Sequence, residues 1–194
     1  MSNIIANLPS ELQVNTFQFL VKPNERVILV GNPGVGKTIF IRRIKKSGFS
    51  PRYSPSKIVQ FNKINRRVSI AELGGLWRFS SAYTKVANPT RIIIMADVTS
   101  GLSIKDVILV HLPRCREYNL PITIIFNKTD IPRVNWKHRE LEWFTKKMAT
   151  ISSQYPPISI FLTSMKENGD ICLTPHFDYL IEFWLWFLRL FCLI

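Results

Sequence analysis

Eight consecutive residues, 31–38, combine three glycines with a lysine and a threonine. The run reads Gly-Asn-Pro-Gly-Val-Gly-Lys-Thr, and it fits the pattern G-x-x-x-x-G-K-[ST] without a mismatch. Glycines let a backbone curl so that consecutive N–H groups point inward at an anion. Lys37 would place a positive charge beside the β- and γ-phosphates of a nucleotide, and the Thr38 hydroxyl would hold Mg²⁺. The predicted phosphate-binding residues are Gly31, Asn32, Pro33, Gly34, Val35, Gly36, Lys37 and Thr38.

A second polar group, Asn127-Lys-Thr-Asp130, directly follows the apolar run at 121–126. The Asp130 carboxylate can accept two hydrogen bonds from guanine, one from the ring N–H and one from the exocyclic amine. Adenine offers no matching donors and would leave the carboxylate unpaired. Asn127 can hydrogen-bond the base edge and neighbouring loops, and Lys128 can lay its stem along the purine. This group therefore predicts selection of a guanine base.

The strands around these motifs follow from apolar runs and turn residues. Residues 26–31 form a short β-branched run, which is typical of a buried strand. Residues 38–47 then read as a helix, whose N-terminus would add partial positive charge under bound phosphates. Residues 58–64 and 67–73 alternate as the two strands of a β-hairpin. Further buried strands are predicted at 91–97, 121–126 and 158–162.

Three more helices are predicted between and after these strands. One covers 103–112, where Pro113 should end or kink it. Another covers 135–150 with Asn135 as its N-cap, and the last begins at Phe177. Strands that alternate with helices indicate an α/β domain with a parallel sheet covered on both faces. Such a sheet places a ligand site at the carboxyl ends of its strands.

The composition is that of a globular chain. The residues are 46% hydrophobic and 20% charged, which excludes a disordered chain. A length of 194 residues suffices for one domain with a full core. The formal net charge of +13 suggests attraction to anionic surfaces. The basic residues are spread in pairs, however, so a solvated surface and a dedicated binding patch both remain open.

Neither cysteines nor histidines have the spacing of a metal site, and no metal cluster is expected. The residues concerned are Cys115, Cys172, Cys192, His111, His138 and His176. The start of the chain lacks the pattern of a secretory signal, and Ser2 excludes N-myristoylation. We therefore expect a cytoplasmic protein with reduced thiols.

Four motifs occur in one order along the chain: 31–38, Glu72-Leu-Gly-Gly75, 127–130 and Thr163-Ser-Met-Lys166. This order resembles the small GTPases of the Ras superfamily. The Glu-Leu-Gly-Gly run, with Trp77 soon after it, is similar to the Arf-like branch of that superfamily. The resemblance covers roughly residues 25 to 182.

The resemblance implies a P-loop NTPase fold of the small-GTPase type, with a mostly parallel six-stranded sheet and helices on both faces. Residues 25–194 would form this domain, preceded by a lead-in segment at 1–24. The ligands would be GTP or GDP with Mg²⁺, and the partners effector and regulator proteins in intracellular trafficking. Specific nucleic acid is not an expected partner. Besides the residues already named, nucleotide contacts are implied for Gly75, Ser164, Met165 and Lys166, and metal contacts for Thr38 and Glu72.

Three departures from this family bear on catalysis. Glu72 stands where active members have an Asp that holds Mg²⁺ through water. Leu76 occupies the place of the glutamine that orients the attacking water, so GTP hydrolysis is expected to be slow. Only Ser54 or Ser56 is available to replace the threonine of the first switch. The sequence thus predicts a slow GTPase switch, with a non-hydrolysing GTP-binding scaffold as the alternative.

The last sixteen residues, 179–194, are apolar nearly all round, apart from Glu182 and Arg189. They are shorter than the roughly 20 residues that span a bilayer. A buried helix, a partner-binding surface and peripheral membrane docking all fit this pattern.

An adenine-nucleotide enzyme with the same phosphate-binding loop is a further interpretation of the chain, and Asp130 disfavours it.

Overall fold

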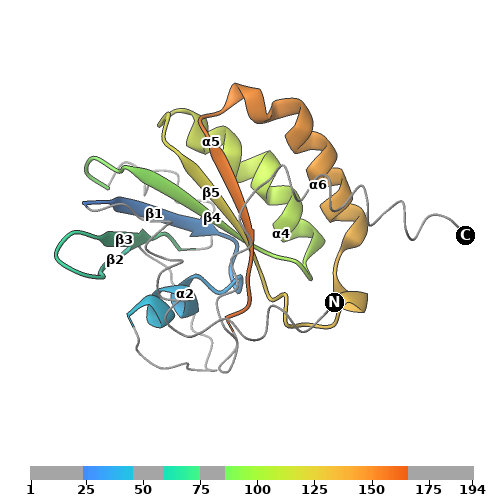
Figure 1. The fold of residues 1–194 in the computed structure, drawn as a ribbon, viewed down its shortest axis with the longest axis horizontal. Coiled ribbons are helices and arrows are strands. Elements are labelled where there is room, and N and C mark those ends of the chain that lie inside the picture. The colour runs from blue at the N-terminus through green and yellow to red at the C-terminus, as the bar shows by residue number, and fades with distance from the viewer. Residues whose placement is uncertain (1–23, 46–58, 75–85, 166–194) are drawn as a thin grey trace, which may run out of the picture.

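The computed structural model describes residues 24–45, 59–74 and 86–165 (Figure 1). The strands in these ranges are β1 (Arg26–Gly31), β2 (Gln60–Lys63), β3 (Ser69–Glu72), β4 (Arg91–Asp97), β5 (Ile122–Asn127) and β6 (Ile158–Leu162). The α-helices are α2 (Lys37–Ile44), α4 (Gly101–Asp106), α5 (Leu112–Arg116) and α6 (His138–Ile151). A π-helical segment, η1 (Val107–His111), joins α4 to α5, and two short 3₁₀ turns are η2 (Arg133–Asn135) and η3 (Ser152–Gln154).

The strands form one sheet in the order β2-β3-β1-β4-β5-β6. Each neighbouring pair is parallel except β2 and β3, which run antiparallel as the predicted hairpin. In the register, Val27 lies opposite Ile70 on one side and Arg91 on the other. The prediction of an α/β domain with a mostly parallel six-stranded sheet is confirmed.

Helices cover both faces of this sheet, as the alternation along β1 requires. Val27 and Leu29 belong to one buried cluster, which also contains Phe40 of α2. Ile28 and Val30 belong to the other, together with buried side chains of α4, η1, α5 and α6. Within this second core Phe126 meets Phe144 edge-on, with ring centroids 4.9 Å apart. Figure 1 shows α2 on one side of the sheet and α4 and α6 on the other.

The helical backbone continues through Pro113, where the sequence predicts an end or a kink. A proline inside a helix lacks an N–H donor, and its ring crowds the carbonyl four residues earlier. Here the chain widens just before the proline, because the N–H of Leu112 donates to the carbonyl of Val107, five residues back. This π turn gives the ring room, so the helical backbone goes on through the proline to Arg116.

The predicted N-cap of the helix after β5 is wrong. Asn135 ends η2, and α6 begins only at His138, without a side-chain cap. The reason is the turn that follows Pro132, in which the Asn135 N–H donates to the Pro132 carbonyl. Trp136 then fixes the segment, since its indole N–H donates to the carbonyl of Ile131 at 2.9 Å.

Several predicted features lie outside the described residues. They are the lead-in segment 1–23, the switch candidates Ser54 and Ser56, Gly75, Leu76, Lys166, the helix from Phe177 and the apolar run 179–194. Among the described residues, no helix combines the length and the apolarity needed to cross a membrane.

Candidate functional site

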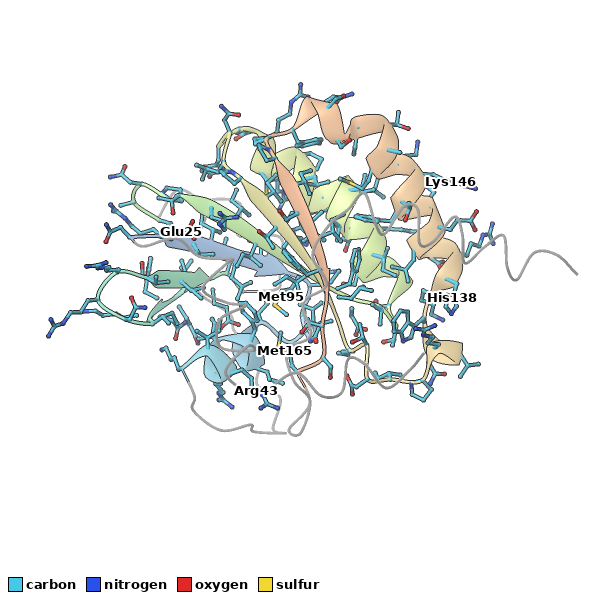
Figure 2. The ribbon with its side chains drawn as sticks, viewed as in Figure 1. Glu25, Arg43, Met95, His138, Lys146 and Met165 are labelled. Carbon is cyan, nitrogen blue, oxygen red and sulfur yellow. The ribbon has the colours of Figure 1, made fainter. Side chains whose placement is uncertain are left out.

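The loop between β1 and α2 has the backbone that only glycines adopt freely. Gly31, Gly34 and Gly36 have φ angles of +143°, +77° and +102°. A Cβ atom on Gly31 would collide with the carbonyl oxygen of Met95, and one on Gly36 with the side-chain amide of Asn127. The loop therefore passes tightly against the ends of β4 and β5. Figure 2 shows Met95 and Met165 close to α2, and both belong to the buried cluster that includes Phe40 of this helix.

Lys37 is the first residue of α2, and its side chain folds back over the loop. The ammonium group donates to the carbonyl oxygen of Gly31 at 2.7 Å and to that of Asn32 at 3.0 Å. Only 6% of the residue is exposed. Burial lowers the pKa of Lys37 to about 8, and the nearby charge of Glu72 opposes that change. A poorly solvated cation at the start of a helix is well placed to bind an anion.

Thr38 and Glu72 join α2 to the end of β3. The Thr38 hydroxyl donates to Oε1 of Glu72 at 2.6 Å, and the carboxylate is almost fully buried. A hydroxyl and a carboxylate suit Mg²⁺, which binds one or two protein groups and completes its shell with phosphate oxygens and water. The two side chains therefore fit this ion. Within the described ranges, no cluster of three or more His, Cys, Asp or Glu side chains offers an all-protein metal site.

Asn127 connects the two predicted motifs directly. It is the last residue of β5, is 2% exposed, and its amide nitrogen donates to the carbonyl of Val35 at 2.8 Å. The side-chain oxygen of Asn127 is also buried, and it has no hydrogen-bond partner among the described residues. A buried acceptor without a hydrogen bond destabilises the folded protein unless a ligand or a water molecule donates to it.

Lys128 follows in a left-handed conformation, with φ of +69°. Its ammonium group lies 2.5 Å from Oδ2 of Asp97, at the end of β4. Asp97 also accepts hydrogen bonds from the N–H and the hydroxyl of Thr99, at 2.8 and 2.6 Å. Sequence reasoning missed Asp97, although a carboxylate that ends a buried strand next to β5 was a signal that could have found it.

The last two predicted motifs also meet in space. The hydroxyl of Ser164 donates to Oδ1 of Asp130 at 2.8 Å, and the Thr129 N–H donates to the Thr163 carbonyl at 3.2 Å. The side chain of Met165 is buried in the cluster beneath α2 rather than turned toward Asp130. The polar residues of the motifs, together with Asp97, gather at the carboxyl ends of β1, β3, β4, β5 and β6, where the sequence predicts a ligand site.

A further polar contact reaches the loop from the helix on the other side of the sheet. The side-chain amide of Asn32 donates to Oδ2 of Asp106 at 2.6 Å, and its oxygen lies 3.3 Å from Nε2 of His111. Burial, helped by the charges of Lys37 and Arg114, lowers the pKa of His111 to about 4. No motif in the sequence connects Asp106 and His111 with the loop.

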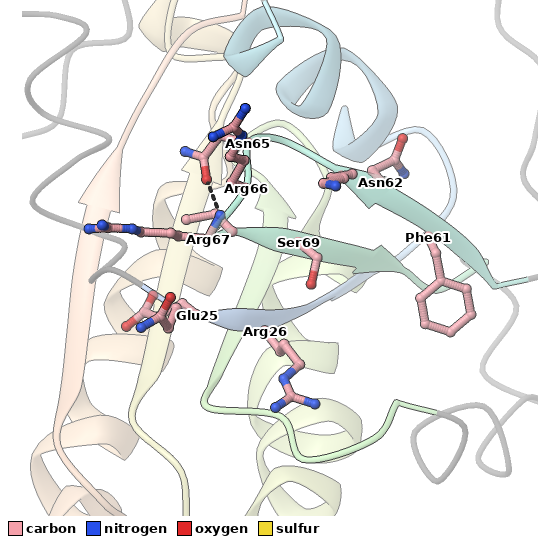
Figure 3. A pocket seen from close by; sticks show the side chains of 11 residues that line it. Glu25, Arg26, Phe61, Asn62, Asn65, Arg66, Arg67 and Ser69 are labelled. Carbon is pink, nitrogen blue, oxygen red and sulfur yellow. Dashed lines mark hydrogen bonds between the residues drawn. The ribbon is translucent and has the colours of Figure 1, made fainter.

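A separate pocket of about 560 Å³ lies at the opposite end of β1, beside the β2–β3 hairpin. Its basic side chains do not converge on one point: Figure 3 shows Arg26, Arg66 and Arg67 pointing in different directions. A convergent set of polar groups is what distinguishes a ligand site, and the 31–38 loop provides the better candidate.

In a search against protein-family models, none matches this chain.

Proposed function

We propose that the protein is a guanine-nucleotide switch of the Arf-like small-GTPase type, with a P-loop NTPase fold, which binds GTP or GDP with Mg²⁺. The observation that carries the proposal is the hydrogen bond from Asn127 to Val35. It fastens a candidate base-binding strand end to a candidate phosphate-binding loop. One nucleotide could then contact both groups at once.

The loop residues 31–38 would bind the phosphates. The positive φ angles of its three glycines let the backbone curl around an anion, and the N-terminus of α2 adds favourable dipole charge. Lys37 would bind the β- and γ-phosphates. Thr38 and Glu72 would hold Mg²⁺. Thr38 would bind the ion through its hydroxyl, and Glu72 would use a carboxylate on a longer side chain than the family's aspartate. Gly75 would sense the γ-phosphate.

The residues at the ends of β5 and β6 would bind the base. Asp130 would accept from the ring N–H and amine of guanine, and its bond from Ser164 fixes one carboxylate oxygen for that purpose. Lys128, held by Asp97, would present its stem to the purine face. Met165 and Lys166 would contribute through their backbone.

Leu76 has no group that can orient water, so hydrolysis of GTP to GDP would be slow. In the switch that we propose, the γ-phosphate draws the segments 48–57 and 74–85 together, and its loss releases them to change partners. Effector and regulator proteins would read these states, with trafficking the expected process. The positive surface and the apolar run 179–194 could add peripheral membrane contact.

A second candidate function is a GTP-binding scaffold that does not hydrolyse its ligand. Leu76 is the observation that favours it, and both candidates share the same binding site. They differ only in the fate of bound GTP.

The test is equilibrium binding of GDP, GTP, ADP and ATP to the full chain with Mg²⁺. We expect binding of the guanine nucleotides at least a hundredfold tighter than that of the adenine nucleotides. The variant Lys37→Met should lose most of this affinity, whereas Lys146→Met, which removes an exposed lysine of α6, should not. Equal affinity for adenine and guanine nucleotides would refute the proposal.

A further inference from the structure

We propose that Asp106 and His111 are positioning residues that hold Asn32 so that its main-chain carbonyl can bind Lys37, and that they thereby set the affinity for nucleotides with a β-phosphate. The inference rests on the proposed function and adds a second element, the π-helical segment η1, to the phosphate site.

The direction of each hydrogen bond follows from the chemistry of the partners. The carboxylate of Asp106 can only accept, so the amide nitrogen of Asn32 must face it, at 2.6 Å. The oxygen of Asn32 must then face His111, at 3.3 Å, and it too can only accept. His111 therefore carries its proton on Nε2. Its lowered pKa keeps the ring neutral near pH 7, and Nδ1 is buried without a partner among the described residues.

The π turn explains how Asp106 and His111, five positions apart, can both hydrogen-bond the side chain of Asn32. In an α-helix 3.6 residues make one turn, so residues five apart face different directions. Asp106 ends α4 and His111 ends η1, the π-helical segment that follows directly, whose last turn is closed by a five-residue hydrogen bond from Leu112 N–H to Val107 O. This widening brings the carboxylate and the imidazole to the same side of the helix, where Asn32 lies between them.

Asn32 itself connects these two side chains to Lys37. The Asn32 side chain is fixed from both ends, and its own carbonyl accepts one of the two hydrogen bonds from the Lys37 ammonium group, at 3.0 Å. A buried ammonium group depends strongly on such partners, because water cannot replace them. Moving the backbone at Asn32 would therefore move the charge that meets the β-phosphate.

A charge-swap experiment tests this chain of contacts. Asn32→Asp places a second carboxylate against Asp106, while Asp106→Asn in the same protein restores an amide–carboxylate pair with the partners exchanged. The nucleotides are GDP, GTP and GMP, which lacks the β-phosphate. Matched controls are Asn119→Asp, at an exposed turn, and Glu142→Gln, which removes a part-exposed carboxylate of α6 that pairs with Lys146. Thermal melting verifies that each variant is folded.

We expect Asn32→Asp to weaken GDP and GTP binding roughly ten- to hundredfold and GMP binding less than about threefold. The double variant should return to within about threefold of the original GDP affinity. Equal losses for GMP and GDP, or a double variant that binds no better than Asn32→Asp, would overturn the inference.

A second measurement does not depend on nucleotide. The ¹⁵N shifts of the His111 imidazole, assigned by comparison with His111→Gln, should show the proton on Nε2 in nucleotide-free protein. A proton on Nδ1 would contradict the network. Failure of the proposed function looks different, because the unmodified protein would then bind neither GDP nor GTP, and both proposals would fall together.

Discussion

The side-chain amide of Asn127 donates to the main-chain carbonyl of Val35, 2.8 Å away, and so ties the end of β5 to the loop after β1. The same amide would collide with a Cβ atom placed on Gly36. The two groups of residues that sequence motifs assign to base and phosphates are thus one packed unit. Disturbing the contact should affect folding and nucleotide binding together.

Substitution of Gly36 by alanine tests this packing. The added methyl group would collide with Asn127, and the residue would also keep an unfavourable φ of +102°. Gly34→Ala is the matched control, because its φ is also positive, at +77°, but open space surrounds its Cβ position. We expect Gly34→Ala to lower the free energy of unfolding by about 1 kcal/mol.

Gly36→Ala should cost at least about 2 kcal/mol more than this control, because either Asn127 or the loop must shift. Denaturant unfolding of both variants measures the difference. Equal losses would show that the contact with Asn127 adds nothing to the cost of the positive φ.

The pH dependence of stability should report His111. The pKa of His111 is lowered from 6.5 to about 4 in the folded protein. Between these values the unfolded chain binds a proton at this residue and the folded protein does not. The free energy of unfolding should therefore fall as the pH drops from 6.5 to 4, by up to ~3 kcal/mol from this group.

Urea unfolding across this pH range, for the unmodified protein and His111→Gln, isolates the contribution. In His111→Gln the free energy of unfolding should no longer show this decrease, since glutamine cannot bind the proton. The control His138→Gln should still show it, because His138 is exposed. A decrease of the same size in His111→Gln would assign it to other groups.

The fate of bound GTP decides between a slow switch and a scaffold. Protein loaded with labelled GTP and Mg²⁺ should convert it to GDP over hours, since Leu76 cannot orient water. Leu76→Gln should accelerate the conversion by about tenfold or more. GTP that stays intact in both proteins would favour the scaffold, and rapid hydrolysis in the unmodified protein would show that another group supplies the missing function.

Local sequence patterns predicted the strands well, because each strand depends on its own apolar run. The ranges 26–31, 91–97 and 158–162 coincide with β1, β4 and β6. The glycine conformations of the loop were likewise predictable, since they follow from residue type. The contact of Asn127 with the loop agrees with the expectation that its amide would bond a neighbouring loop.

Features that depend on how helices are joined could not be predicted in this way. Asn135 had the residue type of an N-cap, but the turn after Pro132 and the bond from Trp136 moved the start of α6 to His138. Asp106 and His111 both contact Asn32 from a helical stretch that contains the π turn before Pro113. No periodicity in the sequence marks such a turn.

We propose that Asp130 selects guanine, and replacing this single carboxylate should therefore change the base preference of the protein. In Asp130→Asn the side chain would donate where the carboxylate accepts, which matches the 2-carbonyl group of xanthine instead of the amine of guanine. We predict that the affinity for GDP falls and that for XDP rises, so that their ratio changes by at least a hundredfold in the variant. An unchanged preference for GDP, with Ser164 and the loop intact, would contradict the account.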